Sequence, residues 1–353
     1  MILDLCQRVR SRPGRGTVDA TIVSSTMKAL QLVEIGAPLV ERDLPVPRPG
    51  AGDVLVEVRA AGICRSDLHY REGSSPVGSL PLTPGHEVAG TVVDVGAGVE
   101  PGRRGEAVCL HYLCTCGRCN YCTRDNEQFC RHAEMIGKHR PGGYARYIVV
   151  PSVNALRIPD SVSYEHAAVM MCSSSTAVHA LRKARIGAGE TVAVIGAGGL
   201  GMSAVQLAYA AGAMKVYAVD IDPARLELAE AFGAVPVNVA DAADDREATS
   251  RVVEANGGAG VDVAVELVGM PDTIRNAVGC LRPKGRAAVA GIGDEKTSFH
   301  VYRELMGKEA ELIGVSDHLK SDLEYLLALA EAGRLTLEPI VTERVGLDAA
   351  AVN

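Results

Sequence analysis

A glycine-rich turn between an apolar strand and a helix constrains the fold of this 353-residue chain more than any other feature. The apolar run TVAVI leads into GAGGLG, which places Gly196, Gly198 and Gly201 at the positions of the G-x-G-x-x-G pattern. A helical stretch follows, and the next apolar run, KVYAVD, ends at Asp220. This order of strand, turn, helix and strand predicts a parallel βαβ unit with a dinucleotide phosphate at the helix N-terminus.

The same turn and the acid after it predict the cofactor. Glycines let the backbone approach a pyrophosphate, and the helix N-terminus supplies N–H groups and a positive dipole end. Asp220, nineteen residues after Gly201, is placed to accept hydrogen bonds from ribose hydroxyls and to repel a 2′-phosphate, which favours NAD over NADP. The alternative is a glycine-rich turn beside a surface aspartate. The predicted cofactor residues are Gly196, Gly198, Gly199, Leu200, Gly201 and Asp220.

Two patterns of predicted secondary structure divide the chain into two domains. After Thr191, apolar strands alternate with helical patterns, and further strands are predicted at 261–269 and 285–293, which is typical of a doubly wound parallel sheet. From Met27 to about Ser152, short alternating runs such as 54–63 and 87–96 are broken by Gly and Pro, which favours an irregular β domain. The predicted fold class is therefore α/β, with residues 175–315 in the dinucleotide-binding domain and residues 27–174 and 316–353 in the other.

The two ends of the chain follow neither of these patterns. Residues 1–26 show no clear period, and we expect an appended, disordered segment before the fold begins at Met27. Residues 347–353 have the pattern of a helix opening, with Asp348 as a possible N-cap and no helix body behind it.

Four cysteines at finger-like spacing predict a closed metal shell. The spacing is C-x₂-C-x₂-C-x₇-C, and four thiolates can surround zinc tetrahedrally and leave no position open, which is typical of a structural site. Disulfides would need an oxidising compartment, and a redox C-x-x-C motif would need only one pair. The predicted structural zinc ligands are Cys116, Cys119, Cys122 and Cys130.

A second set of metal-ligating residue types lies outside that cluster. Cys64 in CRSDLH, His86 in PGHE and the distant Cys172 would supply three ligands and leave a fourth position open, as in catalytic zinc sites. Spacing alone leaves this grouping open, because a lone cysteine in an apolar stretch such as AAVMMCSSS is usually a core residue. Asp67 is placed to orient a metal-bound imidazole, and Glu87 adds a carboxylate beside His86.

Composition and charge exclude several classes of partner. The formal net charge is −7, so the chain lacks the basic footprint of a nucleic-acid or anionic-membrane binder. No apolar run is long enough to span a bilayer, and the arginines near the N-terminus are not followed by the apolar segment of a signal peptide. Ten cysteines without a secretory signal indicate a reducing compartment, and we expect a cytoplasmic protein.

These residues carry a family resemblance that runs from about Met27 to the end of the chain. The chain resembles the zinc-containing medium-chain alcohol dehydrogenases, most closely the NAD-dependent bacterial and archaeal type. The resemblance implies a GroES-like catalytic domain, a Rossmann domain and a homo-oligomer, either a dimer or a tetramer. The segments on which the resemblance rests are MKALQLVEIGAP, CRSDLH, PGHEVAG, the four-cysteine lobe, GGYARYIVVP, the Cys172 segment, GAGGLG and VYAVDID.

The resemblance also implies a role for each matching residue. Cys64, His86 and Cys172 match the catalytic zinc ligands, and Glu87 matches a carboxylate that can approach that zinc. Ser66 matches the hydroxyl that takes the proton of the substrate alcohol, and His69 matches the histidine that passes it toward solvent. The remaining matches are Arg65 at the cofactor pyrophosphate, Thr176 at the nicotinamide, Arg225 near the adenosine ribose and Tyr112 at the substrate cleft.

The expected function is hydride transfer between a small-molecule alcohol and NAD, giving an aldehyde or ketone, with two zinc ions per chain. One alternative is a polyol or amino-alcohol dehydrogenase of the same superfamily, in which an acid often replaces the third cysteine ligand. Another is a non-catalytic sensor that binds zinc and a dinucleotide, which would not need the Ser66–His69 pair. The chain departs from the family pattern in its extension before Met27 and in ending at Asn353, where the family continues into a last strand, so we expect a truncated catalytic domain.

Overall fold

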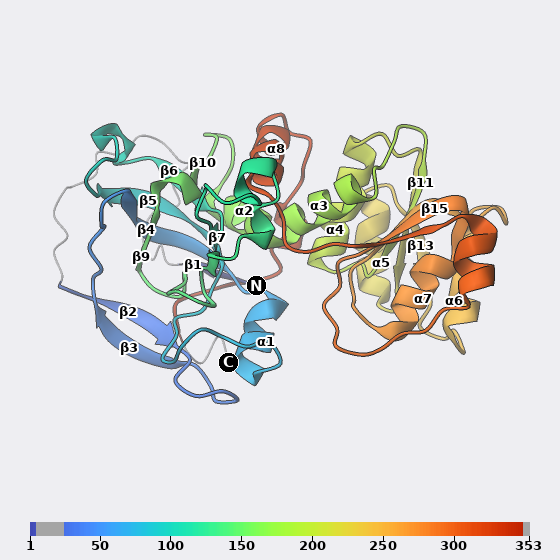
Figure 1. Cartoon of the computed structure of the whole chain (residues 1–353), viewed down its shortest axis with the longest axis horizontal. Coiled ribbons are helices and arrows are strands. Elements are labelled where there is room, and N and C mark those ends of the chain that lie inside the picture. The colour runs from blue at the N-terminus through green and yellow to red at the C-terminus, as the bar shows by residue number, and fades with distance from the viewer. Residues whose placement is uncertain (5–24, 349–353) are drawn as a thin grey trace. The chain divides into compact units, whose positions relative to one another are not determined.

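The structure is a computed structural model that describes residues 1–4 and 25–348, and it separates the chain into two units (Figure 1). Unit 1 comprises Met1–Cys172, Leu319–Gly333 and Val341–Asn353, and unit 2 comprises Ser173–His318 and Arg334–Ile340. The sequence placed the change of domain at residues 174/175 and 315/316. It did not anticipate that residues 334–340 belong with the dinucleotide-binding unit.

Unit 2 is built on the parallel sheet that the glycine motif predicts. Its order is β13-β12-β11-β14-β15-β16 with every pairing parallel, and the order reverses at β11, as in dinucleotide-binding sheets. The central strands are rich in Val and Ala and are buried on both faces. The strands are β11 (Thr191–Ile195), β12 (Lys215–Asp220), β13 (Val235–Asn238), β14 (Val261–Glu266), β15 (Leu281–Val289) and β16 (Glu311–Gly314).

The helices of unit 2 connect these strands and cover the sheet. α3, α4 and α5 contact one another in succession, and α6 contacts α7. Asp222 caps α5 by accepting the N–H of Ala224, with Pro223 at the first helical position, where proline is best tolerated. The helices are α3 (Ser175–Lys183), α4 (Gly199–Ala210), α5 (Pro223–Ala231), α6 (Asp245–Ala255) and α7 (Pro271–Gly279), and the short η6 (Val301–Leu305) and η7 (Met306–Lys308) lead to β16.

Unit 1 is the irregular β unit expected from the N-terminal half. Its main sheet has the order β10-β6-β5-β4-β1-β17, and β9 also pairs with β4. Apart from the parallel β1–β17 pair, its pairings are antiparallel. The strands are β1 (Ile2–Asp4), β4 (Asp53–Gly62), β5 (Glu87–Val95), β6 (Ala107–Leu110), β9 (Tyr147–Pro151), β10 (Ala155–Arg157) and β17 (Arg344–Val345). The two units together confirm the predicted α/β class.

Smaller elements surround that sheet. Strand β2 (Thr26–Gln31) pairs with β3 (Val40–Pro45), and β7 (Leu113–Cys114) pairs with β8 (Glu134–Met135). The helices of unit 1 are α1 (Arg65–Glu72), α2 (Tyr164–Val169) and α8 (Lys320–Glu331). Among the helices of the described ranges, none is long and apolar enough to cross a membrane.

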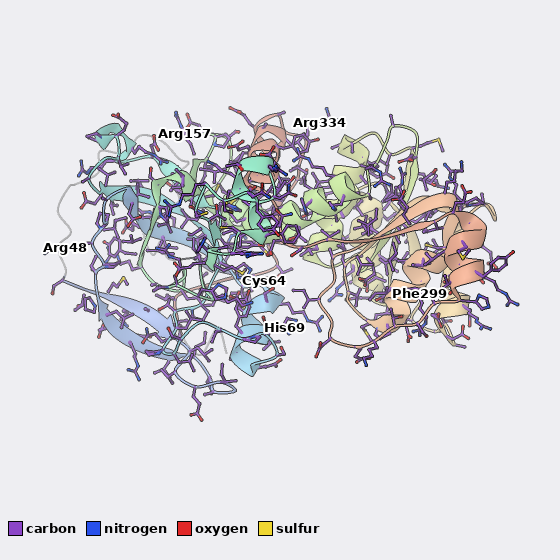
Figure 2. The ribbon with its side chains drawn as sticks, viewed as in Figure 1. Arg48, Cys64, His69, Arg157, Phe299 and Arg334 are labelled. Carbon is purple, nitrogen blue, oxygen red and sulfur yellow. The ribbon has the colours of Figure 1, made fainter. Side chains whose placement is uncertain are left out.

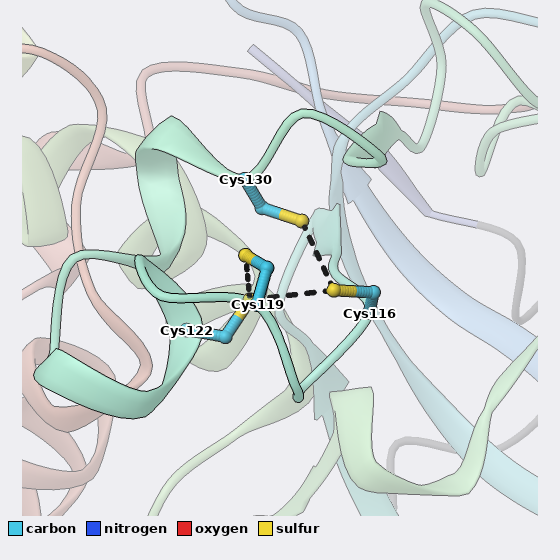
Figure 3. A group of neighbouring side chains, drawn as sticks. All are labelled: Cys116, Cys119, Cys122 and Cys130. Atoms are coloured by element: carbon cyan, nitrogen blue, oxygen red, sulfur yellow. Dashed lines mark hydrogen bonds between the residues drawn. The ribbon is translucent and has the colours of Figure 1, made fainter.

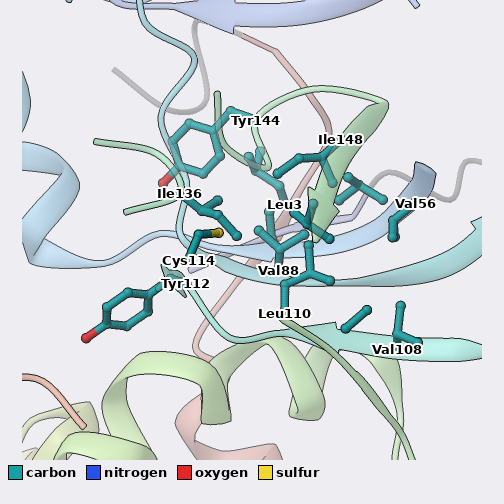
Figure 4. Packing of buried hydrophobic residues seen from close by; sticks show 14 of the residues in the cluster. Leu3, Val56, Val88, Val108, Leu110, Tyr112, Cys114, Ile136, Tyr144 and Ile148 are labelled. Atoms are coloured by element: carbon teal, nitrogen blue, oxygen red, sulfur yellow. The ribbon is translucent and has the colours of Figure 1, made fainter. Parts of the chain in front are cut away.

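The hydrophobic core of unit 1 lies under β4, β5, β6 and β9 (Figure 4). Aliphatic side chains from alternate strand positions, including Val56, Val88 and Leu110, are fully or nearly fully buried there. Two tyrosines, Tyr112 and Tyr144, belong to the same cluster and bring their hydroxyl groups to its border with polar groups.

The first residues of the chain join this sheet, although we expected residues 1–26 to be disordered. Strand β1 pairs with Ala60–Gly62 of β4 and with β17, and the N–H of Ile63 donates to the carbonyl of Met1 at 3.0 Å. Leu3 is fully buried in the core. A three-residue strand carries no periodic signal, so tertiary pairing alone decides it. Residues 5–24, and residues 349–353 of the expected helix opening, lie outside the described residues.

We predict that Leu3→Ala destabilises unit 1 by about 2–5 kcal/mol, because it leaves a cavity in a packed core. Leu68→Ala, at a leucine that is 37% exposed on α1, is the matched control and should cost roughly 1 kcal/mol or less. The measurement is urea-induced unfolding of both variants. Equal midpoints for Leu3→Ala and wild type would contradict the placement of β1 in the sheet.

Candidate functional site

The four predicted cysteines converge on one point in a lobe between β7 and β8 (Figure 3). The Sγ–Sγ distances are 3.4 Å for Cys119–Cys122, 3.6 Å for Cys116–Cys130 and 3.9 Å for Cys116–Cys122. A tetrahedron with zinc–sulfur bonds of about 2.3 Å has edges of about 3.8 Å, whereas a disulfide is about 2.05 Å long. The arrangement fits four ligands around one metal ion and does not fit disulfides.

Backbone N–H groups already favour thiolates in this lobe. The N–H of Arg118 lowers the pKa of Cys116 to about 6, and the N–H of Cys122 lowers the pKa of Cys119. Desolvation raises the pKa of Cys122 to about 11. A divalent cation held between the four sulfurs would favour their thiolate forms.

The second predicted set also converges. One ligand atom from each of Cys64, His86, Glu87 and Cys172 lies within 4.8 Å of all the others, and the Cys64 and Cys172 sulfurs are 3.9 Å apart. Cys64 precedes α1, and His86 and Glu87 stand at the start of β5. Cys172 lies in the π-helical segment Met170–Ser174, a helix form that is frequent at functional sites. The structure therefore brings together the residues whose grouping spacing alone left open.

Asp67 orients the histidine of this set. Its Oδ1 accepts Nδ1–H of His86 at 3.2 Å, which leaves the lone pair of Nε2 for a metal. Oδ1 also accepts the N–H of Gly85 at 3.2 Å. Oδ2 accepts the N–H of Cys64 at 3.1 Å and the hydroxyl of Tyr144 at 3.0 Å. Sequence reasoning found Asp67 but missed Tyr144, although Tyr144 stands in the GGYARYIVVP motif.

The titratable groups of this buried set shift one another's pKa values. Burial opposes a charge on His86, but Asp67 and Cys64 outweigh it and raise the pKa of the imidazole. A hydrogen bond from Cys172 and the proximity of His86 lower the pKa of Cys64, while the same bond and burial raise the pKa of Cys172. Burial and the neighbouring Cys64 raise the pKa of Glu87. Two thiols and an imidazole are the ligand types that a soft, zinc-like cation takes, and such a cation would favour the thiolate form of both cysteines.

The predicted proton-transfer residues lie on α1, where Figure 2 labels Cys64 and His69. Ser66 and His69 are three residues apart and so share a helix face. Ser66 Oγ lies 3.7 Å from Cys64 Sγ, and His69 Nδ1 lies 3.1 Å from Ser74 Oγ. In the part of the chain that the structure describes, no hydrogen bond joins Ser66 directly to His69. Arg65 is exposed at the first helical position.

Tyr112, which the resemblance places at the substrate cleft, lies beside His86. Its side chain is buried in the core of unit 1, and its ring meets the ring of His86 edge to face with centroids 5.5 Å apart. The structure thus places Tyr112 against a candidate metal ligand.

In unit 2 the predicted glycine turn has the geometry of a phosphate-binding loop. Gly196 has φ +93°, a conformation that L-residues with side chains rarely adopt, and Gly198 is the N-cap of α4. A Cβ at Gly201 would clash with the carbonyl oxygen of Gly196, so the helix can approach the turn this closely only with glycine there. Gly199 and Leu200 open α4, at whose N-terminus the sequence predicts an anion site.

Asp220 ends β12 and ties the turn to it. Oδ2 accepts the N–H of Ala197 at 2.7 Å, and Oδ1 accepts the N–H groups of Ile221 and Asp222. Arg225 lies 3.7 Å from Asp220 and 3.4 Å from Asp222. Thr176 lies in the first turn of α3 and is partly exposed.

Comparisons with known proteins agree with this geometry. Residues 50–160 match the family model of the alcohol dehydrogenase GroES-like domain, and residues 199–332 match that of the zinc-binding dehydrogenases. An NAD-dependent alcohol dehydrogenase of Sulfurisphaera tokodaii is 33% identical and covers 92% of this chain and 94% of its own. An L-threonine 3-dehydrogenase of Pectobacterium atrosepticum is 32% identical, with coverages of 91% and 88%.

A solved structure extends the likeness to the fold. A zinc-binding dehydrogenase of Sinorhizobium meliloti bound to NADP superposes with a TM-score of 0.85 at 30% identity, over 93% of this chain and 95% of that chain. The fold and the matches define a zinc-dependent NAD(P) dehydrogenase. The chain belongs to the zinc-containing medium-chain alcohol dehydrogenase family, which confirms the resemblance inferred from the motifs.

We predict two zinc ions per chain, one for each ligand set. Cys116→Ser should lose one zinc and lower the melting temperature, because structural zinc binding contributes folding free energy. Cys64→Ser should also lose one zinc and should abolish turnover while keeping the fold. Elemental analysis and thermal unfolding of the three proteins measure this. One zinc in active wild-type protein would refute the two-site interpretation.

Proposed function

We propose that the protein is an NAD-dependent alcohol dehydrogenase that interconverts a small-molecule alcohol with an aldehyde or ketone. The observation that carries the proposal is the convergence of Cys64, His86 and Cys172 on one point, with Glu87 beside them. Three such ligands leave one position of a tetrahedral zinc ion for a substrate oxygen. A zinc ion bound there would act as a Lewis acid on that oxygen, and NAD would accept the hydride.

The chain's own residues would supply the proton path. Ser66 Oγ lies 3.7 Å from Sγ of the candidate ligand Cys64, so its hydroxyl would lie close to a substrate oxygen bound at the metal. Ser74 Oγ can donate to the carbonyl of His69 at 3.3 Å, and it then accepts Nδ1–H of the same histidine. This tautomer leaves a lone pair on Nε2 of His69, which can take up a proton and release it to solvent. Because the two side chains make no direct hydrogen bond among the described contacts, we propose that a cofactor hydroxyl or a water links them.

Cofactor binding is proposed for unit 2. The N-terminus of α4 would hold the pyrophosphate, Asp220 would accept the ribose hydroxyls, and Thr176 and Arg225 would make further contacts. The preference for NAD rests on Asp220 and agrees with the name of the Sulfurisphaera relative. The NADP in the Sinorhizobium structure makes the preference a point to be tested.

A second candidate, an L-threonine 3-dehydrogenase, is favoured by four relatives of that name, each 32% identical to this chain. The third ligand argues for the first candidate, because Cys172 stands where polyol and amino-alcohol dehydrogenases often carry an acid. NADH absorbance with a panel of primary alcohols, secondary alcohols and L-threonine separates the two. Turnover with L-threonine alone would overturn the alcohol assignment, and no turnover in a fully zinc-loaded protein that binds NAD would favour a non-catalytic sensor.

We predict that Ser66→Ala lowers kcat for alcohol oxidation by about 10²- to 10⁴-fold, the usual contribution of a group that transfers a proton. His69→Gln should lower kcat less, because water can replace the last member of the relay. Small exogenous bases should restore part of the lost kcat. Ser75→Ala, at a serine of the neighbouring segment, is the control. Steady-state kinetics measure all three, and an unimpaired Ser66→Ala enzyme would exclude the role of the hydroxyl.

We predict a clear NAD preference in kcat/KM. Asp220→Gly should weaken NAD binding by roughly 10- to 100-fold, which corresponds to about 1.5–3 kcal/mol for hydrogen bonds to a charged group. It should also bring the kcat/KM values for NAD and NADP closer together. Asp222→Asn removes a neighbouring charge but keeps the capping oxygen of α5, and it should change NAD binding much less. Comparable kcat/KM for NADP and NAD in the wild type would contradict the assignment.

A further inference from the structure

We propose that Tyr144 is a positioning residue for the candidate catalytic metal centre, with its hydroxyl holding both the Asp67 carboxylate and the Gly62 carbonyl. The inference rests on the proposed function, since it concerns the metal that Cys64, His86 and Cys172 would hold. Tyr144 touches none of these three ligand atoms in the described contacts, so it would act through the groups that place them.

The hydroxyl contacts one side chain and one carbonyl. Tyr144 Oη lies 3.0 Å from Asp67 Oδ2 and 3.3 Å from the carbonyl oxygen of Gly62, so its single proton is shared between them. Asp67 also accepts hydrogen bonds from Nδ1 of His86 and from the backbone N–H groups of Cys64 and Gly85. A shift of the Asp67 carboxylate would therefore move two candidate ligands together.

The Gly62 carbonyl connects Tyr144 to the fourth member of the set. The side chain of Glu87 packs directly against Gly62, where a Cβ would clash with the Glu87 carboxylate. Gly62 ends β4 and pairs with Glu87 across the sheet. The hydrogen bond from the Tyr144 hydroxyl to the carbonyl of Gly62 therefore restrains the backbone segment that the Glu87 carboxylate contacts.

The ring of Tyr144 shapes the turn that presents His86. Gly85, directly before His86, has φ +93°, and a Cβ there would clash with the ring of Tyr144. The backbone of Tyr144 is fixed as well, because its N–H donates to the carbonyl of Pro84 at 3.0 Å and its carbonyl accepts the N–H of Leu30 at 2.8 Å. The side chain is 1% exposed and belongs to the close-packed core cluster of unit 1 (Figure 4), which restricts the ring.

A tyrosine that merely fills the core would show a different pattern. Such a residue needs one partner for its hydroxyl, and its loss would lower stability without changing a metal site. Tyr144 instead contacts the groups that hold Cys64, His86 and Glu87. Partners of this kind, which orient a metal ligand from outside the ligand shell, typically change metal affinity by 10- to 100-fold when they are removed.

The test is Tyr144→Phe, which removes the hydroxyl and keeps the ring. Tyr147→Phe is the matched control, because Tyr147 is also a buried tyrosine of unit 1 but belongs to a different hydrophobic cluster. We expect Tyr144→Phe to release zinc from the catalytic centre to a chelator about tenfold more readily, with the zinc of the four-cysteine lobe unchanged. Tyr147→Phe should release both ions as the wild type does.

Cobalt substitution gives a readout that a purely structural role would not move. The visible spectrum of cobalt reports ligand geometry, and a Cys64→Ser chain gives the contribution of the lobe for subtraction. We expect the spectrum of the catalytic centre to change in Tyr144→Phe and not in Tyr147→Phe. If the spectrum and zinc release of Tyr144→Phe match the wild type, the inference is overturned. If wild-type protein holds metal only in the lobe, the proposed function fails instead.

A double-mutant cycle tests whether Tyr144 acts through Asp67. Asp67→Asn and Tyr144→Phe should each speed zinc release from the catalytic centre. The double variant should release zinc only slightly faster than Asp67→Asn alone, because the effects of substitutions within one hydrogen-bond network are not additive. Fully additive effects on zinc release would overturn the route through Asp67.

Discussion

The carboxylate of Asp67 is the interaction on which the geometry of unit 1 depends. A buried, ionised carboxylate is costly unless its oxygens are hydrogen-bonded, and Asp67 accepts from the backbone of Cys64 and Gly85, from His86 and from Tyr144. These donors come from three segments that are far apart in the sequence: the start of α1, the turn before β5 and the segment before β9. One anion therefore determines where those segments meet. Its removal would leave two backbone N–H groups and the Nδ1–H of His86 to find other partners.

The two metal-ligand sets are stabilised in different ways. In the lobe, the ligands lie within fifteen residues of sequence, and backbone N–H groups favour the thiolates of Cys116 and Cys119. In the second set, the ligands extend from Cys64 to Cys172 and are held by the β sheet, by Asp67 and by burial. A local loop can form the first site largely by itself, whereas the second site needs the folded unit. This difference fits a structural role for the first set and a chemical role for the second.

The parts of the structure that were predictable from sequence are those with a local signal. The β11–turn–α4–β12 unit and the cysteine lobe follow from motifs within thirty residues, and the parallel sheet follows from the alternation of strands and helices. The grouping of Cys172 with Cys64 and His86 needed the family resemblance, since no spacing rule links residues so far apart. Strand β1, the position of residues 334–340 in unit 2 and the contacts of Tyr144 could not be predicted. Each depends on tertiary pairing or on packing, which leaves no periodic pattern in the sequence.

The carboxylate of Asp220 in unit 2 lies among several other polar and charged groups. Its carboxylate resembles that of Asp67 in being fixed by backbone N–H groups, here those of Ala197, Ile221 and Asp222. Its charge is offset by Arg225, which also approaches Asp222 and is about half exposed. A 2′-phosphate would be repelled by two carboxylates but attracted by this arginine, and it would have to draw Arg225 away from both acids. Because Arg225 is shared with Asp222, the proposed preference for NAD depends on the ion pairs around Asp220 as well as on the carboxylate itself.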